Sequence, residues 1–247
     1  MSLQFGSYRF TPGIAGTALT LLVLYLLINL GLWQLRRADE KQHLLQRFAT
    51  GQQTTVDLQG DTATQLPRYQ HVRARGQYDA SRQILLDNMP SQHGAPGYHV
   101  LTPFVLASSG AVILVDRGWL TLGSDRKVLP PLGSVLPEHE VAGLIDELPQ
   151  PGIRMGTPGS GSTGWPKVLN YPRPEDLHAL YGERILPRVL LLDAQAPSGY
   201  ERVWQARFGF GPERHTGYAI TWFAMAATLF IAYAWANLER HTPNHDE

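Results

Sequence analysis

His215 is the side chain in this sequence with the clearest potential for chemistry, because it stands at the start of a long apolar segment. From about Thr216 to Leu238 no residue carries a full charge. At 1.5 Å per residue, such a stretch is long enough to cross a hydrocarbon core of about 30 Å. Imidazole is a common ligand of haem iron and other metals. Tyr218 and Trp222 follow three and seven residues later, so a helix places all three rings on about the same face.

Residue chemistry alone leaves two interpretations of this segment open. In the first, His215 is a ligand of haem iron, Gly217 leaves room for a flat macrocycle, and the rings of Tyr218 and Trp222 pack against it. In the second, Tyr218 and Trp222 are ordinary interfacial anchors and His215 is a polar cap on a membrane helix. Without further information, the second interpretation is the favoured one.

The other chemically capable residues form no recognisable catalytic or metal-binding pattern. His93 and His99 flank a predicted Pro-Gly turn, but no third ligand at a fixed spacing accompanies them. Residues 159–164 match GxGxxG, yet no strand precedes them and no helix follows, so we interpret them as a loop. No serine occupies a GxSxG elbow. Four acidic residues near predicted strand ends pair with no evident base, namely Asp87, Asp116, Asp193 and Glu201. We therefore expect a protein that is not an enzyme.

Composition excludes several further classes of protein. The 247 residues carry 21 Lys and Arg against 21 Asp and Glu, and this zero net charge gives no support for nucleic-acid binding. The sequence contains no cysteine, which excludes disulfides, thiolate metal sites and cysteine nucleophiles. The 18 Pro and 24 Gly indicate many turns and little long helix outside the apolar segments.

A second apolar segment lies near the N-terminus, where Gly13–Leu32 contains no charged residue. Its length predicts a transmembrane helix over residues 13–33. A cleaved signal peptide would have a shorter apolar region and a small-x-small cleavage site, and Trp33-Gln-Leu-Arg-Arg offers no such site. Apolar residues continue at a helical period beyond the span, which predicts a juxtamembrane helix over residues 34–48.

Between the apolar segments, short strand-like pieces alternate with turns, which predicts a mostly antiparallel β domain of the sandwich or barrel kind. The predicted strands are 72–78, 83–88, 98–106, 111–116, 141–145 and 185–193, with one helix at 175–181. The expected order is a tail (1–12), a transmembrane helix (13–33), an aqueous domain (34–213), a second transmembrane helix (216–238) and a tail (239–247).

The distribution of basic residues around the two predicted spans bears on which side of the membrane the β domain occupies. Most of the flanking basic residues lie on the side of the β domain: Arg36, Arg37, Lys41, Arg47, Arg202, Arg207 and Arg214, against Arg9 and Arg240 in the tails. The positive-inside rule would therefore place the domain in the cytoplasm, although this rule weakens for long translocated domains.

Four short motifs, in this order along nearly the whole chain, resemble those of the Surfeit locus protein 1 family of cytochrome c oxidase assembly factors. They are Gly31–Arg36 (GLWQLR), Pro96–Pro103 (PGYHVLTP), Val115–Trp119 (VDRGW) and His215–Phe223 (HTGYAITWF). Asp116 stands where many family members have asparagine, a difference that we expect to be tolerated. Between about residues 123 and 190, only the Trp165-Pro166 pair matches the family.

The resemblance implies an α+β membrane protein in which two transmembrane helices flank a β-rich extracytoplasmic domain. It implies a bacterial inner membrane location, with the central domain in the periplasm and both termini in the cytoplasm. It also implies that the protein binds haem a through His215 and assists haem insertion into oxidase subunit I. Tyr218 and Trp222, from their helical spacing, are then expected to line the haem. Subunit I, haem a synthase and the lipid bilayer are the implied partners. The alternative is a structural chaperone for subunit I, or for the haem-synthesising enzyme, that binds no haem.

Overall fold

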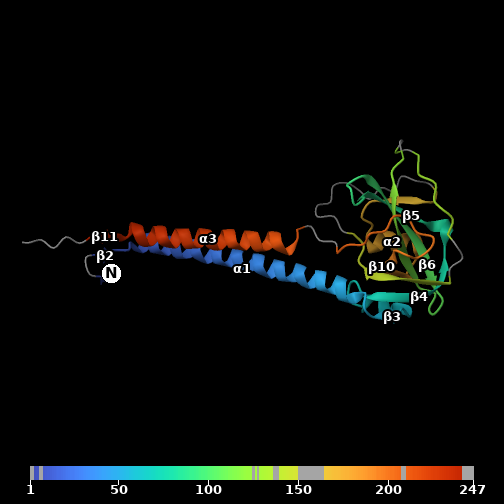
Figure 1. The fold of residues 1–247 in the computed structure, drawn as a ribbon, viewed down its shortest axis with the longest axis horizontal. Coiled ribbons are helices and arrows are strands. Elements are labelled where there is room, and N and C mark those ends of the chain that lie inside the picture. Colours follow the sequence, from blue (N-terminus) through green and yellow to red (C-terminus); the bar gives the residue numbers. More distant parts are fainter. Residues whose placement is uncertain are drawn as a thin grey trace, which may run out of the picture. The chain divides into compact units, whose positions relative to one another are not determined.

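The computed structural model describes residues 3–5, 8–123, 126, 128–135, 139–149, 164–206 and 210–240. The chain divides into two compact units (Figure 1). One unit combines residues 1–45 with residues 207–247, and it contains one long helix and most of another. The other unit, residues 46–206, contains the β domain.

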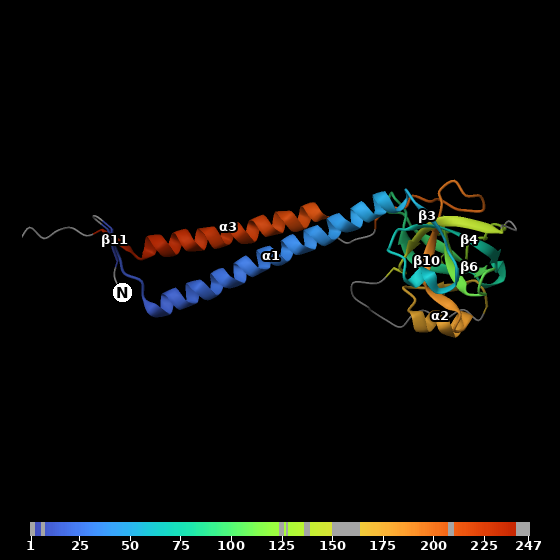
Figure 2. The same cartoon turned by 90° about the horizontal axis from the view of Figure 1, so that it is seen from below.

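The long helices of the first unit are α3 (Pro212–Ala236) and α1 (Ile14–Gly51), whose residues after Leu45 belong to the second unit. Both are long and apolar enough to cross a membrane, judged by length and composition. They lie side by side and run in opposite directions (Figures 1 and 2). The Thr17 hydroxyl lies 2.6 Å from the Tyr233 hydroxyl, which joins the start of α1 to the end of α3. Large apolar side chains are exposed along both helices, among them Leu21, Tyr25, Phe230 and Trp235.

A small antiparallel sheet joins the two ends of this helix pair. Its strands are β1 (Leu3–Phe5), β2 (Tyr8–Phe10) and β11 (Leu238–Arg240), with β2 in the centre. The Thr11 N–H donates to the carbonyl of Asn237 at 2.9 Å, next to the β2–β11 pairing. The sequence did not predict this sheet, since three-residue strands are too short to establish an alternating pattern.

The second unit is built on one eight-stranded sheet, in the order β3-β4-β8-β10-β7-β6-β5-β9. An additional pairing of β4 with β6 closes five of its strands, β4, β8, β10, β7 and β6, into a barrel. Within this ring only β7 and β10 are parallel. The strands are β3 (Thr55–Asp57), β4 (His71–Tyr78), β5 (Ile84–Pro90), β6 (Pro96–Leu106), β7 (Val112–Thr121), β8 (Glu140–Asp146), β9 (Lys167–Leu169) and β10 (Ile185–Leu192).

Barrel closure depends on β6 and β4 meeting closely. The first part of β6 pairs with β5, and its end pairs with Gly76–Tyr78 of β4. A Cβ atom at Gly76 would collide with the backbone oxygen of Val105, so this crossing requires glycine. The prediction of a mostly antiparallel β domain is confirmed, and the closing pairing decides for the barrel.

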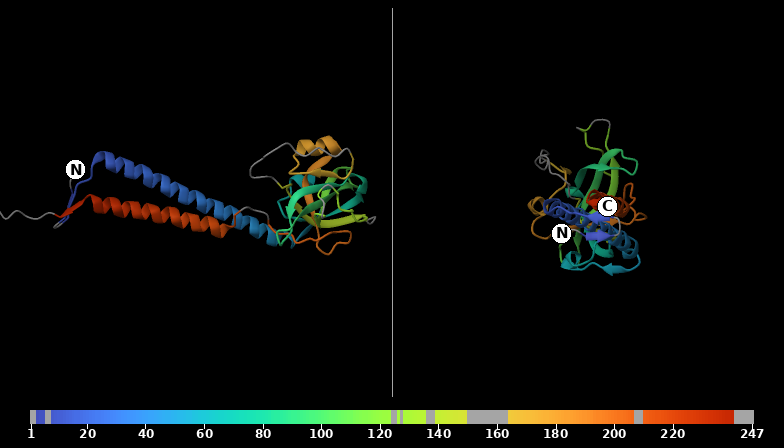
Figure 3. Two further views of the ribbon diagram at one scale, coloured as in Figure 1. Left: turned by 90° about the horizontal axis from the view of Figure 1, so that it is seen from above. Right: turned by 90° about the vertical axis from the view of Figure 1, so that its left-hand side faces the viewer.

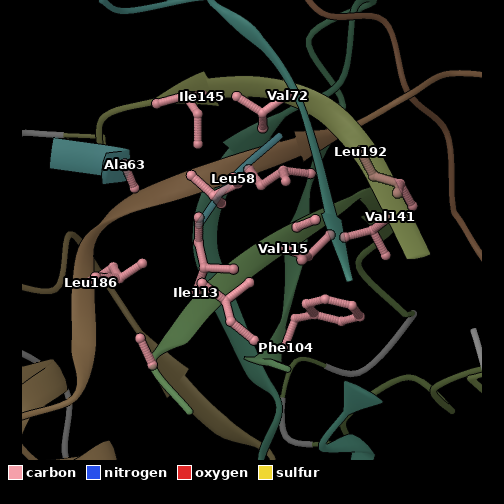
Figure 4. Packing of buried hydrophobic residues seen from close by; sticks show 14 residues of the cluster. Leu58, Ala63, Val72, Phe104, Ile113, Val115, Val141, Ile145, Leu186 and Leu192 are labelled. Carbon is pink, nitrogen blue, oxygen red and sulfur yellow. The ribbon is translucent and has the colours of Figure 1, made fainter. Parts of the chain in front are cut away.

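Alternating side chains of the same strands build two apolar clusters. Figure 4 shows the cluster in the barrel, where Phe104, Ile113 and Val115 are fully buried and point into the interior. The intervening residues of β7, Val112 and Leu114, belong to a second cluster. Because both faces of β7 and β10 are covered there, Val112–Val115 of β7 and Val189–Leu192 of β10 are continuous apolar runs.

A short helix, α2 (Pro174–Tyr181), belongs to the second cluster through Leu177 and Tyr181 and lies outside the barrel (Figure 3). The Tyr181 hydroxyl donates to the carbonyl of Arg82 at 2.6 Å, and burial raises the pKa of its phenol. Two 3-10 helices complete the unit, η1 (Gly60–Thr64) and η2 (Ala80–Arg82).

The predicted strands and the predicted helix are all present, with bounds that shift by a few residues. The turn proposed at Pro96-Gly97 is wrong, because both residues belong to β6 and pair with Pro90 and Met89. The chain reverses instead at Ser91–Ala95, where the backbone N–H of Ser91 donates to the carbonyl of Ala95. Gly94 supplies the positive φ of 81° that this reversal needs.

Candidate functional site

His215 lies in the first turn of α3, whose start at Pro212 precedes the predicted span at residue 216. Proline suits this position because the first helical N–H has no partner within the helix, and its fixed φ is already helical. Glu213 adds an acidic side chain where the helix dipole favours one. The imidazole is thus carried by a regular helix from its first turn onward.

The closest polar partner of His215 comes from the other long helix. The Nδ1 atom of His215 lies 2.7 Å from Oε1 of Gln34, in α1. An amide oxygen can only accept a hydrogen bond, so Nδ1 must carry the proton in this arrangement. In the neutral imidazole the lone pair is then on Nε2, and this tautomer can bind a metal through that nitrogen.

The two aromatic residues predicted beside His215 occupy different positions on α3. Trp222 lies two helical turns from His215 on nearly the same line, and it is half-buried. Ala219, between them, is buried, so this line of the helix is covered. Tyr218 lies to one side, with 47% of its surface exposed. A Cβ atom added at Gly217 would meet no other atom within 4 Å, so the space beside this glycine is open.

An aromatic ring lies close to His215, and a cation packs on that ring. The ring of Phe210 meets the imidazole edge to face, with 6.4 Å between the ring centroids. The guanidinium of Arg214 lies over the Phe210 ring, 4.4 Å from its centroid. This end of α3 therefore combines an imidazole, aromatic surface and a positive charge.

Close packing between α1 and α3 holds the Gln34–His215 pair in register. Gly31 is buried one turn before Gln34, and a Cβ atom there would lie 2.6 Å from the ring of Phe223. Glycine lets the two helices approach at this level, as small residues do in membrane helix pairs. The sequence motif at the end of the first apolar segment, Gly31–Arg36, thus contributes both the contact with Phe223 and the partner of His215.

His99 is placed in the β domain by a buried carboxylate and not by a second histidine. Its Nδ1 lies 2.7 Å from Oδ2 and 3.0 Å from Oδ1 of Asp116, and both residues are at most 7% exposed. Asp116 also accepts the backbone N–H of Gly118 at 3.0 Å. The imidazole lies next to Trp204, with 5.8 Å between ring centroids. His93 is exposed in the turn before β6.

Replacing Asp116 tests the role of this pair in stability. Asp116→Asn retains an oxygen that can accept both hydrogen bonds, so we expect a melting temperature close to that of the wild type. Asp116→Leu leaves two buried donors without an acceptor, at a cost of about 1–3 kcal/mol for each. Thermal unfolding of the full chain in detergent, followed by circular dichroism, measures the difference. Asp87→Leu is the control, because its partner Arg126 is exposed. Equal melting for Asp116→Leu and the wild type would contradict this role.

The remaining acidic candidates occupy separate places in the β domain. Asp87 forms an ion pair with Arg126 at 2.6 Å, and Asp193 lies 3.0 Å from Nε2 of His71. Glu201 is exposed, and its backbone pairs with Trp119. Among the described residues, no group of three or more His, Asp or Glu side chains is arranged to hold a metal ion. Most of the GxGxxG segment, residues 159–163, lies outside the described residues.

Comparison with known proteins assigns the chain to a family. The model of the SURF1 family matches residues 21–227, which include α1 from Leu21 onward, the whole barrel and the first two-thirds of α3. A SURF1-like protein of Rickettsia felis is 27% identical over 225 residues, covering 88% of this chain and 95% of the relative. A SURF1-like protein of Drosophila melanogaster is 25% identical over 234 residues, covering 83% of this chain and 72% of the relative. Surfeit locus protein 1 of Takifugu rubripes is 29% identical over 134 residues, covering 47% of this chain and 55% of the relative. Since the family model spans most of the sequence, the chain belongs to the SURF1 family.

Proposed function

We propose that this protein is a haem-handling assembly factor for haem–copper oxidase, which binds haem a through His215 and assists its insertion into subunit I. SURF1 proteins are known generally as oxidase assembly factors, and they are not named as enzymes. The observation that carries the haem assignment is the Gln34–His215 hydrogen bond, which leaves the Nε2 lone pair of His215 free to bind iron.

The surroundings of His215 suit a large, flat and partly charged ligand. Trp222, half-buried, and Tyr218, exposed, offer aromatic surface on which such a ring can pack. Arg214, one residue before the ligand and in the first turn of the helix, suits the carboxylates of a haem. In this proposal His215 holds the iron, and the aromatic residues orient the ring and exclude water.

A membrane location is the second part of the proposal. We place the protein in the bacterial inner membrane, with α1 and α3 as the two spans, the β domain in the periplasm and both termini in the cytoplasm. The length and apolar character of the helices support two spans. The β2–β11 pairing, which holds the start of α1 beside the end of α3, supports two termini on one side. Haem a synthase and oxidase subunit I are then the partners within the same bilayer.

The optical spectrum of the full protein tests this function. We expect protein purified in detergent from cells that make haem a to show a Soret band and to co-purify with subunit I. Co-purification with subunit I in the absence of any bound haem, although haem a is being made, would favour a structural chaperone. That outcome would remove the haem part of the proposal and leave the assembly role standing.

A further inference from the structure

Gln34 contributes a hydrogen-bond acceptor to His215 from a different helix. The residue is half-buried in α1, and its Oε1 lies 2.7 Å from Nδ1 of His215 in α3. A histidine on a free helix end can rotate and can carry its proton on either ring nitrogen. A fixed acceptor at Nδ1 removes both freedoms, because it selects one tautomer and one ring orientation.

The acceptor is also neutral, and this has a chemical consequence. Histidines that bind metals commonly donate their second N–H to a carboxylate, a carbonyl or water, and the partner sets the basicity of the ligand. A carboxylate draws the Nδ1 proton strongly and makes the imidazole a better donor to iron. An amide oxygen draws it less, so the imidazole stays a weaker ligand. A protein that must release its haem to an oxidase subunit benefits from the weaker ligand.

The β domain offers a contrast within the same chain. There His99 donates to the Asp116 carboxylate at 2.7 Å, and both residues are buried. His215 has the amide of Gln34 at the same distance, at a half-exposed position. The buried His99 thus has a charged partner, and the half-buried candidate ligand His215 has a neutral one.

We infer that Gln34 is a positioning residue for haem binding: its side-chain oxygen holds His215 with Nε2 available to iron, and its neutrality keeps the bound haem releasable. This inference rests on the proposed haem ligation by His215. The contact requires both long helices, so haem binding also depends on the pairing of α1 with α3.

Substitutions of Gln34 test the inference on the full protein in detergent. In Gln34→Leu the acceptor is lost, and we expect haem to be retained about 10- to 100-fold more weakly, the usual effect of removing such a partner. In Gln34→Glu the acceptor returns as a carboxylate, so we expect haem retention to exceed that of the wild type and the reduction potential of the haem to fall below the wild-type value. Gln42→Leu, at an exposed glutamine of α1, is the matched control and should change neither property.

Chemical rescue separates the hydrogen bond from general damage to the helix. In His215→Gly, added imidazole can occupy the vacated space and donate an N–H to Gln34, whereas 1-methylimidazole lacks this N–H. We expect imidazole to restore the spectrum at lower concentration than 1-methylimidazole does. In His215→Gly combined with Gln34→Leu, this preference for imidazole should disappear.

Different results would overturn different claims. Wild-type retention and potential in Gln34→Leu, together with haem loss in His215→Ala, would refute the positioning role and leave His215 as the ligand. An unchanged spectrum in His215→Ala would refute the ligand assignment itself. An imidazole preference that persists without Gln34 would show that the amide does not hold the Nδ1 proton.

Discussion

Replacement of His215 by alanine is expected to remove the Soret band from protein purified out of cells that make haem a. Alanine has no atom that can bind iron, and aromatic packing on Tyr218 and Trp222 alone would leave a weak and heterogeneous association. The measurement is the haem-to-protein ratio, read from the Soret absorbance and an independent assay of protein concentration. The substitution should leave the fold intact, since alanine has a high helix propensity and His215 is only half-buried.

A second histidine in the helical unit supplies the control for this experiment. His43 is exposed on α1 and lies 3.4 Å from Asp39 one turn away, so His43→Ala removes an imidazole with no role in the proposed site. We expect His43→Ala to retain the wild-type ratio. Tyr218→Leu and Trp222→Leu should reduce the ratio less than His215→Ala does, because they remove packing surface and leave the ligand. A Soret band of wild-type position and intensity in His215→Ala would show that another residue binds the haem.

Replacement of Gly31 by leucine is expected to separate the two long helices and to abolish haem binding together with it. Even one added carbon would lie 2.6 Å from the Phe223 ring, and a leucine adds three more. Overpacking of this kind costs about 1–3 kcal/mol in a packed interior. Gln34 is one turn away, so the 2.7 Å contact with His215 should be lost when the helices move apart. Haem content and thermal stability in detergent, measured on the same preparations, report both effects.

The chain contains a matched glycine and a compensating partner for this test. Gly16 is in the same helix, and a Cβ atom there would meet nothing within 4 Å, so Gly16→Leu should preserve both haem content and stability. Phe223→Ala removes the ring that the introduced leucine side chain would strike, and we expect it to restore part of the haem content of Gly31→Leu. Equal loss in the two glycine variants would mean that leucine disturbs α1 generally and that the contact with Phe223 is unimportant.

Several features of this protein could be predicted from the sequence because they depend on local patterns. Uncharged apolar runs indicated both long helices, and short strand-like pieces separated by turns indicated the strands that became β4, β6, β7 and β10. The motifs that resembled the Surfeit locus protein 1 family pointed to the family that the comparisons then confirmed. Haem ligation by His215 stays a prediction, since it rests on that resemblance and on the chemistry of one side chain.

Other features depended on contacts between residues far apart in the chain. The series of short strands and turns was compatible with a sandwich or a barrel, and the pairing of Gly76–Tyr78 with Phe104–Leu106 shows that the sheet closes into a barrel. From the sequence, Asp116 was a tolerated replacement of asparagine, and the structure shows that its carboxylate is the hydrogen-bond partner of His99. No local pattern could reveal either feature, because strand register and side-chain pairing are set by packing across the sheet.

The partner of His215 illustrates the same division most directly. The residue types alone identified a histidine at the start of an apolar helix, with two aromatic residues at helical spacing. They could not identify Gln34, which is 181 positions away and looked like one more polar residue at the end of the first span. Its role appears only when Gly31 lets α1 and α3 approach, because a hydrogen bond of 2.7 Å needs both backbones in place. The sequence alone determined which side chain is chemically capable, and the packing of the two helices determined which of its nitrogen atoms is available.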